Sequence, residues 1–324
     1  MKQVYFEQTG GPQVLKYGDM PDPSARPGEV VVDVHAASVN AADWKVRSGD
    51  GYRVAKFPSG IGRDFSGRIA SLGPGVTEFK IGDPVFGVCD VGFEGAYSEK
   101  VAIKAAIIAR KPEKLSHKDA AAMALTGLTA LVAIEDTLAL KPGEAILVQG
   151  GAGGVAGLSI QIAKHIGARV ITTASPSNHA YVKAMGADQV IDYNKEDFTK
   201  VLANIDAVFD TVGGSVVERS FAVLKPGGRA AFIASGPTAP KPSRGDVRSL
   251  RPNVKRDRQH LERILSLWNE GAVRVPEIKL FKLAEAPAAH ELSEGRHLRG
   301  KLVFMVRWGA EWDAGQFRVP NYEL

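Results

Sequence analysis

The sequence predicts an α/β protein in which a doubly wound parallel sheet is inserted into an antiparallel, barrel-like β domain. Between residues 29 and 108, short alternating or β-branched runs are separated by Gly and Pro, which is typical of antiparallel strands. From 118 to about 278, continuous apolar runs alternate with helical segments, and this alternation predicts right-handed βαβ crossovers and a parallel sheet. After 278 the β texture returns. We therefore expect one domain from 1–118 with 279–324 and a second from 119–278.

The strands expected in the parallel sheet are continuous apolar runs, because strands covered by helices on both faces lose their polar alternation. They comprise residues 145–150, 169–174, 188–193, 206–212 and 228–234. Between the first two, apolar residues recur at helical spacing from Val155 to Ile166, and Gly167 stands where a C-terminal cap is expected. Further helices are expected at 179–185, 195–203, 216–224, 258–270 and 287–293, and a closing strand at 301–306.

The net charge of the chain indicates which class of ligand it could bind. Lysine and arginine total 41 against 36 aspartate and glutamate, a net charge of +5. This excess is too small for a nucleic-acid-binding arm but suits a phosphate-bearing ligand. The N-terminus lacks the basic start and apolar run of a signal peptide, and we expect no later stretch to be apolar for long enough to span a membrane. The sequence thus predicts a cytoplasmic protein without nucleic-acid or membrane partners.

Cys89 is the only cysteine of the chain. A single cysteine excludes an intramolecular disulfide and a cysteine-based structural zinc lobe. No basic neighbour is evident in the sequence around it, so we expect a small buried apolar residue rather than a reactive thiol.

A glycine-rich turn stands between an expected strand and an expected helix. In it Gly151, Gly153 and Ala156 fit the pattern G-x-G-x-x-G/A, which in a βαβ unit indicates dinucleotide binding. The first glycine would allow the tight turn, the second would let the backbone approach a pyrophosphate, and the small third residue would let helix and strand pack. The turn backbone at Ala152 and the N–H groups of Gly154 and Val155 would then face the phosphates. The alternative is a purely structural turn.

The residues after the second strand bear on the choice of cofactor. An acidic residue about twenty positions after the glycines would bind the ribose 2′-hydroxyl of NAD, but this region has no carboxylate. Ser175, Asn178 and His179 can instead donate hydrogen bonds to a 2′-phosphate. The sequence therefore favours NADPH over NADH, with Ser175 as a plain turn residue as the alternative.

These motifs, together with several longer blocks, resemble the medium-chain dehydrogenase/reductase superfamily, specifically its zinc-free quinone oxidoreductase (zeta-crystallin-like) branch. The similar blocks cover nearly the whole chain in the family's order. They are residues 36–49, 60–87, 95–103, 124–130, 148–157, 185–193, 209–214 and 298–304. The resemblance implies a Rossmann cofactor domain inserted into a GroES-like catalytic domain.

Two departures from the zinc-dependent relatives bear on the chemistry. Asn40 stands where those relatives carry a zinc-binding Cys, and Gly62, Arg63 and Asp64 stand where they carry a Gly-His-Glu metal motif. Cys89 lies elsewhere in the sequence, and we expect His35 and His117 not to cluster, so no catalytic metal site is expected. Without a Lewis acid, reduction of an electron-poor quinone or enone is favoured over oxidation of an alcohol.

The candidate catalytic residues are Asn40, Tyr52 and Asp43, which lie in a block that in this family lines the substrate cleft. The Asn40 amide and the Tyr52 hydroxyl could donate hydrogen bonds to the oxyanion that an incoming hydride generates. Structural roles are equally open: Asn40 could cap a turn, Tyr52 could be a half-buried loop aromatic, and Asp43 could hold a helix start.

The resemblance also implies further cofactor contacts. Thr126 would contact the nicotinamide side and Tyr193 the 2′-phosphoribose, while five residues at the strand ends would surround the adenosine and ribose. These five are Val212, Gly213, Ile233, Ala234 and Ser235. Lys301 could lie near the cofactor or be a strand-edge lysine.

Three functions follow from these features. The leading hypothesis is an NADPH-dependent reductase of quinones or α,β-unsaturated carbonyls. The alternatives are an enoyl-thioester (enoyl-CoA) reductase and a non-catalytic NADPH-binding protein. Residues 241–258 are rich in Arg and Lys; we expect a solvated, mobile face, and the alternative, an anion-binding lip, would favour the thioester. Residues 271–281 resemble the edge strand through which the family pairs its cofactor domains, which indicates a homodimer.

Overall fold

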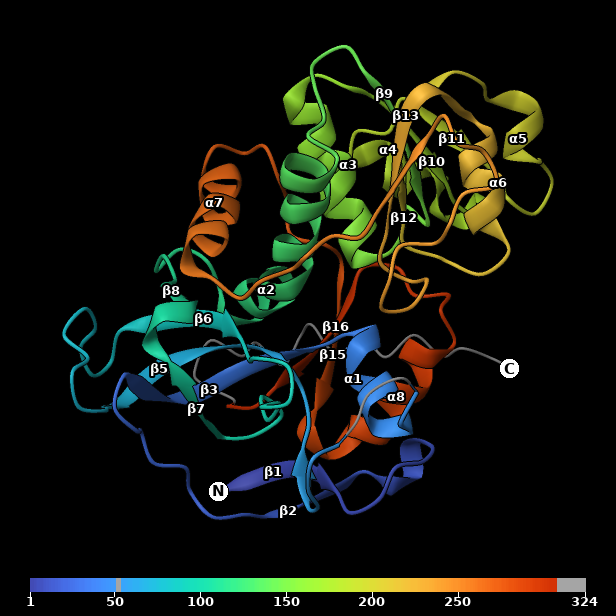
Figure 1. Cartoon of the computed structure of the whole chain (residues 1–324). Coiled ribbons are helices and arrows are strands. Elements are labelled where there is room, and N and C mark those ends of the chain that lie inside the picture. The colour runs from blue at the N-terminus through green and yellow to red at the C-terminus, as the bar shows by residue number, and fades with distance from the viewer. Residues whose placement is uncertain (51–53, 308–324) are drawn as a thin grey trace.

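The computed structural model describes residues 1–50 and 54–307, which form two large sheets joined through a long central helix (Figure 1). A smaller antiparallel sheet holds the N-terminal strand β1 (Lys2–Phe6) between β2 (Lys16–Asp19) and β4 (Ser59–Gly60). The α/β fold class predicted from the sequence is confirmed.

The first large sheet is parallel throughout and six-stranded, in the order β11–β10–β9–β12–β13–β14. Its strands are β9 (Ala145–Gln149), β10 (Arg169–Thr173), β11 (Gln189–Ile191), β12 (Ile205–Asp210), β13 (Leu224–Phe232) and β14 (Arg248–Leu250). The strand order reverses between β9 and β12, so the sheet is doubly wound and has a topological switch point at the carboxyl ends of these two strands.

Both faces of this sheet are buried. Ile146 and Val148 of β9 enter one core, and Leu147 between them enters the core on the opposite face, as period-two alternation requires. The first core includes residues of α2 (His117–Leu131), α3 (Gly154–Ile166), α4 (His179–Ala184) and α7 (Arg258–Asn269); the second includes residues of α5 (Phe198–Val201) and α6 (Val216–Ala222). The continuous apolar runs of the sequence are therefore explained by cover on both sides.

The second large sheet has the order β15–β16–β3–β5–β6–β8, with β7 also paired to β3. Its strands are β3 (Glu29–Val39), β5 (Asp64–Leu72), β6 (Pro84–Val88), β7 (Lys100–Lys104), β8 (Ile108–Arg110), β15 (Ile278–Lys282) and β16 (Lys301–Met305). All its pairs are antiparallel except β15 with β16. Two helices, α1 (Ala41–Ser48) and α8 (Ala286–Glu294), contact each other beside this sheet.

Helix α2 joins the two halves of the molecule. With the π-helical turn that continues it, Val132–Thr137, it spans 21 residues with mean hydropathy 1.3, long and apolar enough by length and composition to cross a membrane. This corrects the expectation that no stretch has that length. The segment is 83% buried inside the protein, because α2 packs against β3, β5 and β6 on one side and against α3 and α7 on the other.

Two strands differ from the sequence-based expectation. The sixth parallel strand, β14, lies inside the Arg/Lys-rich segment 241–258, which was not expected to contain a strand. Residues 271–281 do not supply an edge of the parallel sheet: their strand, β15, pairs with β16 in the other sheet. The strands at the two ends of the parallel sheet are β11 and β14. The domain limits at 118 and 279 and the homodimer stay predictions.

Candidate functional site

The glycine turn lies between β9 and α3, at the switch point of the parallel sheet. Gly150 takes the left-handed conformation, with φ of 76°, so the tight turn belongs to Gly150 and not to Gly151 as expected. Gly151 is required for another reason: a Cβ there would lie 2.2 Å from Thr172 Oγ1 of the neighbouring strand. Ala156 is 1% exposed within the helix–sheet core, as its small size predicts.

The start of α3 fits a phosphate group. Gly153 is the N-cap of this helix, and no side chain caps the first turn, which includes the backbone N–H groups of Gly154 and Val155. The space beside Gly153 is open, since the nearest atom to a Cβ placed there would be Gly150 O at 3.6 Å. Ala152 is half-buried in this turn. A helix N-terminus with this free approach favours an anion.

Ser175 and Tyr193 lie just beyond two adjacent strand ends. Thr173 of β10 is paired with Ile191 of β11, and Ser175 and Tyr193 each follow two residues later. Asn178 Nδ2 donates to Ser175 Oγ at 3.0 Å, and Tyr193 is 48% exposed. The pairing of β10 with β11 therefore places Ser175 and Tyr193 at the same edge of the sheet, and Asn178 bonds Ser175 there.

The remaining strand-end residues also meet. Ile233 N donates to Asp210 O, and a Cβ on Gly213 would lie 2.7 Å from Ala234 O, so the ends of β12 and β13 are in close contact. Val212 is 41% exposed. Ser235 Oγ is buried and has no hydrogen-bond partner within residues 1–50 and 54–307. An unsatisfied hydroxyl at this edge fits the binding of a polar ligand such as a ribose.

Thr126 lies in the middle of α2 and is 2% exposed. Its hydroxyl donates to Ala122 O at 2.6 Å, a bond that threonines commonly make inside helices. The hydroxyl proton is thus already used, and only the oxygen could take part in a further hydrogen bond.

Asn40 lies between β3 and α1 and is the N-cap of that helix. Its backbone N–H donates to Asp43 Oδ2 at 2.8 Å, and the Tyr97 hydroxyl donates to the same oxygen at 2.7 Å. Asp43 is fully buried; this burial raises its pKa to about 6, against the opposing effect of Arg63. Asp43 thus holds the start of α1 by accepting from the backbone N–H of the N-cap residue Asn40. Tyr52 lies outside the described residues.

A buried polar cluster surrounds Asn40. Lys301 Nζ donates to Asn40 Oδ1 at 2.8 Å and lies 4.0 Å from Asp64 Oδ2. Ser38 Oγ donates to that carboxylate at 2.6 Å, and Arg63 forms an ion pair with Glu94 at 3.0 Å. Burial lowers the pKa of Lys301 and raises that of Asp64, while the attraction between the two opposes both shifts. Lys301 is therefore not an exposed strand-edge residue.

The side chains of this cluster do not fit a zinc ion. Zinc in proteins takes thiolate, neutral imidazole or carboxylate ligands, whereas Asn40 Oδ1 already accepts from an ammonium and Arg63 is itself a cation. In the part of the chain that the structure describes, no group of three or more His, Cys, Asp or Glu is arranged to hold a metal.

His35 and His117 lie closer than expected. Their rings stack with centroids 4.3 Å apart, and His117 Nδ1 lies 2.8 Å from Ser66 Oγ. The expectation that they are not clustered is wrong as regards this pair. Cys89 is 2% exposed and burial raises its pKa, so it is the buried apolar residue that was expected.

Four arginines of segment 241–258 donate hydrogen bonds to backbone carbonyls of other segments. Arg256 donates to Cys89 O at 3.3 Å, Arg251 to Phe232 O at 2.8 Å, and Arg258 to Ile108 O at 2.9 Å. Arg244 donates to Leu224 O at 2.9 Å. The expectation of a solvated, mobile face is therefore wrong for these four, because their guanidinium groups satisfy backbone carbonyls.

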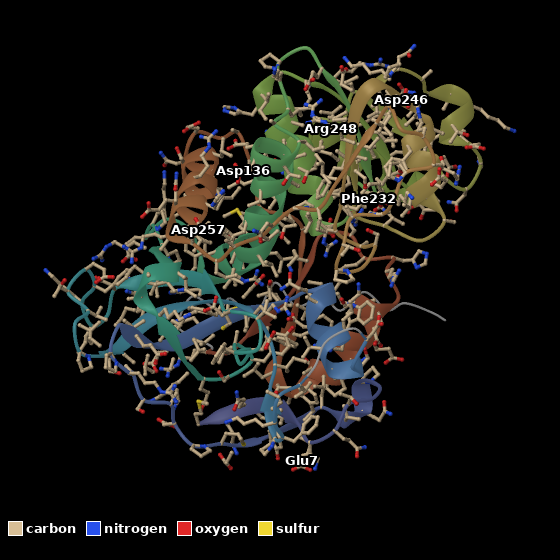
Figure 2. All side chains as sticks on the ribbon, viewed as in Figure 1. Glu7, Asp136, Phe232, Asp246, Arg248 and Asp257 are labelled. Atoms are coloured by element: carbon tan, nitrogen blue, oxygen red, sulfur yellow. The ribbon has the colours of Figure 1, made fainter. Side chains whose placement is uncertain are left out.

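A surface pocket of about 350 Å³ lies beside this segment. Asp136 and Asp257, labelled in Figure 2, line it together with His260. His260 Nδ1 lies 2.8 Å from an Asp257 carboxylate oxygen, and its Nε2 lies 2.8 Å from an Asp136 carboxylate oxygen. None of the predicted site residues lines this pocket. It is thus separate from the glycine turn and from the cluster around Asn40.

Sequence reasoning missed Tyr97, Ser38 and the partners of Lys301. Tyr97 and Lys301 both stand in blocks that resemble the family. No pattern in either block indicates that Tyr97 bonds Asp43 across 54 residues, or that Lys301 bonds Asn40 across 261. Only the pairing of β16 with β3, which opposes Leu302 to Val39, brings Lys301 to Asn40.

Comparison with known proteins agrees with this fold. Residues 26–113 match the alcohol dehydrogenase GroES-like domain, and residues 185–304 match a family described as zinc-binding dehydrogenase. The quinone oxidoreductase of Pseudomonas aeruginosa is 32% identical over 325 residues, covering 94% of this chain and 99% of that protein. The chain belongs to the quinone oxidoreductases of the medium-chain dehydrogenase/reductase superfamily.

Solved quinone oxidoreductase structures share the whole architecture. That from Coxiella burnetii is 40% identical with a TM-score of 0.88, covering 95% of this chain and 99% of its own. The Escherichia coli enzyme, solved in complex with NADPH, is 28% identical with a TM-score of 0.87, covering 94% and 100%. The chain also matches polyketide synthase GfsB of Streptomyces halstedii at 32% identity, but there it spans only 5% of that protein's length.

Proposed function

We propose that this chain is an NADPH-dependent reductase that transfers a hydride to a quinone or an α,β-unsaturated carbonyl without a metal ion. The observation that carries the proposal is the glycine turn, where a helix start without a side-chain cap and the open side of Gly153 leave room for a phosphate. The E. coli quinone oxidoreductase, which has the same fold, was solved with NADPH. Bound NADPH would supply the hydride.

The parallel sheet would hold the cofactor along its carboxyl edge. The first turn of α3 would bind the pyrophosphate through backbone N–H groups. Ser175, Asn178 and Tyr193 would bind the 2′-phosphoribose, and NADPH would be preferred because no carboxylate follows β10 to repel that phosphate. The residues at the ends of β12 and β13, Val212, Gly213, Ile233, Ala234 and Ser235, would surround the adenosine and ribose, and Thr126 would lie on the nicotinamide side.

Asn40 and Tyr52 would act on the acceptor. As the hydride arrives, negative charge develops on the acceptor's oxygen, and a fixed amide N–H or phenol O–H stabilises it. Asp43 would serve as a positioning residue, since its carboxylate binds the Asn40 N–H and the Tyr97 hydroxyl. The proton would come from Tyr52 or from solvent.

The reaction would not need zinc. Lys301, Arg63 and the Asn40 amide occupy a region without a zinc-type ligand set, and a conjugated acceptor needs less electrophilic help than an alcohol. The description of one matching family as zinc-binding therefore would not extend to this chain.

A steady-state panel tests the proposal against its alternatives. NADPH and NADH are each assayed with an ortho-quinone, a para-quinone, a short alkenal and an enoyl-CoA. The proposal expects turnover with NADPH on the quinones or the alkenal. Turnover confined to the thioester would indicate an enoyl-thioester reductase, and tight NADPH binding without turnover would indicate a binding protein.

The acceptor site is tested by Asn40→Ala and Tyr52→Phe. Loss of an oxyanion donor costs on the order of 10²-fold in kcat, so each variant should turn over more slowly. NADPH affinity, measured by fluorescence titration, should be retained, because neither side chain belongs to the phosphate site. Unchanged kcat in both variants would contradict the assignment.

A further inference from the structure

Lys301 is a lysine that the fold buries almost completely. It begins β16 and is 4% exposed. Its ammonium donates to Val39 O at 2.7 Å and to Asn40 Oδ1 at 2.8 Å. Val39 and Asn40 lie where β3 passes into α1. The ammonium of Lys301 is therefore held at Asn40, the residue proposed to contact the quinone or enone substrate.

The burial of Lys301 beside Asp64 is not expected to increase the stability of the folded protein. Removing an ammonium and a carboxylate from water costs several kcal/mol each, and a buried pair often does not recover that cost. Asp64, the counter-charge, is fully buried; its Oδ2 lies 4.0 Å from Nζ, and its Oδ1 has no hydrogen-bond partner in the described residues. A function in the site explains better why the charge is kept there.

Lys301 fixes which way the Asn40 amide faces. An ammonium has only donors, so the amide must turn Oδ1 toward Nζ and Nδ2 away from it. Nδ2 has two protons, and its hydrogen bond to Ser38 O is a long one, at 3.4 Å. The Asn40 side chain also acts as a hydrogen-bond donor toward the Asp64 carboxylate and so lowers the pKa of Asp64. The long bond to Ser38 O is therefore the one that an oxygen of the substrate could replace.

Lys301 is also joined to the glycine turn. Gly300 N donates to Ala152 O at 2.9 Å, and Gly300 forms a parallel bridge with Gly153. A Cβ on Gly154 would lie 2.7 Å from Lys301 Cδ. The stem of Lys301 thus packs on the first turn of α3 while its ammonium holds Asn40.

We propose that Lys301 is a positioning residue that holds the Asn40 carboxamide in register with the glycine turn, with the Asn40 Nδ2 donor directed to the acceptor's oxygen. The inference rests on the proposed function, because it assigns Lys301 a role through Asn40. Its effect should therefore disappear when Asn40 is absent.

A double-mutant cycle tests this dependence. K301M retains the apolar stem but removes the charge and the donor, and it is compared with N40A and with K301M/N40A for kcat, acceptor KM and NADPH affinity. We expect K301M to lower kcat about tenfold, as loss of an orienting partner commonly does. The double variant should be no slower than N40A, with NADPH affinity within about twofold of wild type in all three.

Lys111 offers a matched control. It is equally buried, at 4% exposed, and its ammonium donates to Pro112 O and Leu115 O, away from the cluster. K111M should lose stability but keep kcat. If Met at 301 prevents folding, the same cycle is run with K301R, whose planar fork cannot reproduce the single contact to Asn40, and the same non-additivity is expected.

The outcomes separate the two proposals. Additive losses in the cycle, or a kcat for K301M equal to that of K111M, would overturn the positioning role while leaving the proposed function intact. Wild-type kcat in N40A would remove the acceptor role of Asn40 and this inference with it. Wild-type protein without turnover on any acceptor would overturn the proposed function itself.

Discussion

Two glycines of the phosphate turn, Gly151 and Gly153, are required for different reasons. A Cβ at Gly151 would meet Thr172 Oγ1 at 2.2 Å, whereas a Cβ at Gly153 would meet nothing nearer than 3.6 Å. Gly151→Ala is therefore expected to destabilise the protein by about 2 kcal/mol through overpacking. Gly153→Ala should cost less than about 1 kcal/mol as a weaker N-cap, but it should lower NADPH affinity about tenfold, because the methyl group fills the phosphate approach.

Urea denaturation and NADPH titration of both variants measure these effects. Each variant serves as the control for the other, since one change acts on packing and the other on ligand approach. If Gly153→Ala binds NADPH as tightly as wild type, the pyrophosphate does not lie against the start of α3.

The C-terminal end of helix α3 gives a prediction about stability. Gly167, its C-cap, has φ of 93°, a left-handed conformation that disfavours any residue with a Cβ. Gly167→Ala should lower the free energy of unfolding by about 1 kcal/mol. Gly245→Ala is the control, because Gly245 has no positive φ and no atom within 4 Å of a Cβ placed there. Equal stability of the two variants would contradict the prediction.

The elements that the sequence predicts well are those whose burial leaves a periodic trace. The strand before the glycine turn, the helix from 154 to 166 and its Gly167 cap are all confirmed, since each depends on local apolar spacing or on a cap residue. The helix expected at 195–203 is shorter, Phe198–Val201, because Asp197 caps its start by accepting a hydrogen bond from Thr199 N.

The missed elements are those fixed by distant neighbours. β14 has three residues, Arg248–Leu250, without an apolar run, and it exists because β13 offers it hydrogen bonds. The sequence of residues 278–282 would suit an edge strand of either sheet, and the pairing with β16 decides which sheet they join. The contact of Lys301 with Asn40 likewise depends on the pairing of β16 with β3, which local sequence does not encode.

For the whole molecule, buried histidines predict sensitivity to acid. Burial, followed by the charges of His35, Lys111 and Arg68, lowers the pKa of His117 from 6.5 to about 3; burial also lowers that of His290 to about 3. Below pH 6.5 these two histidines are protonated in the unfolded chain but stay neutral in the folded protein. Their contribution to the free energy of unfolding, fully present above pH 6.5, is therefore lost as the pH falls toward 3.

The variant His117→Gln isolates this effect, because glutamine keeps a polar side chain but takes up no proton. Between pH 7 and pH 4 the wild type should lose about 2 kcal/mol relative to the variant, after allowance for the partial exposure of the ring. Urea denaturation of both proteins across this pH range gives the difference directly. Parallel stability curves would show that His117 protonates as easily in the folded protein as in the unfolded chain.

The proposed chemistry depends on a phosphate-binding turn that serves a reaction site without zinc. Its most direct test is a single-turnover measurement on protein stripped of metal by exhaustive chelation, in which NADPH absorbance is followed after mixing with a quinone. We predict that NADPH is consumed at the rate of untreated protein and that added zinc gives no increase. Loss of the reaction on chelation with recovery on zinc addition, or no consumption of NADPH before or after treatment, would contradict it.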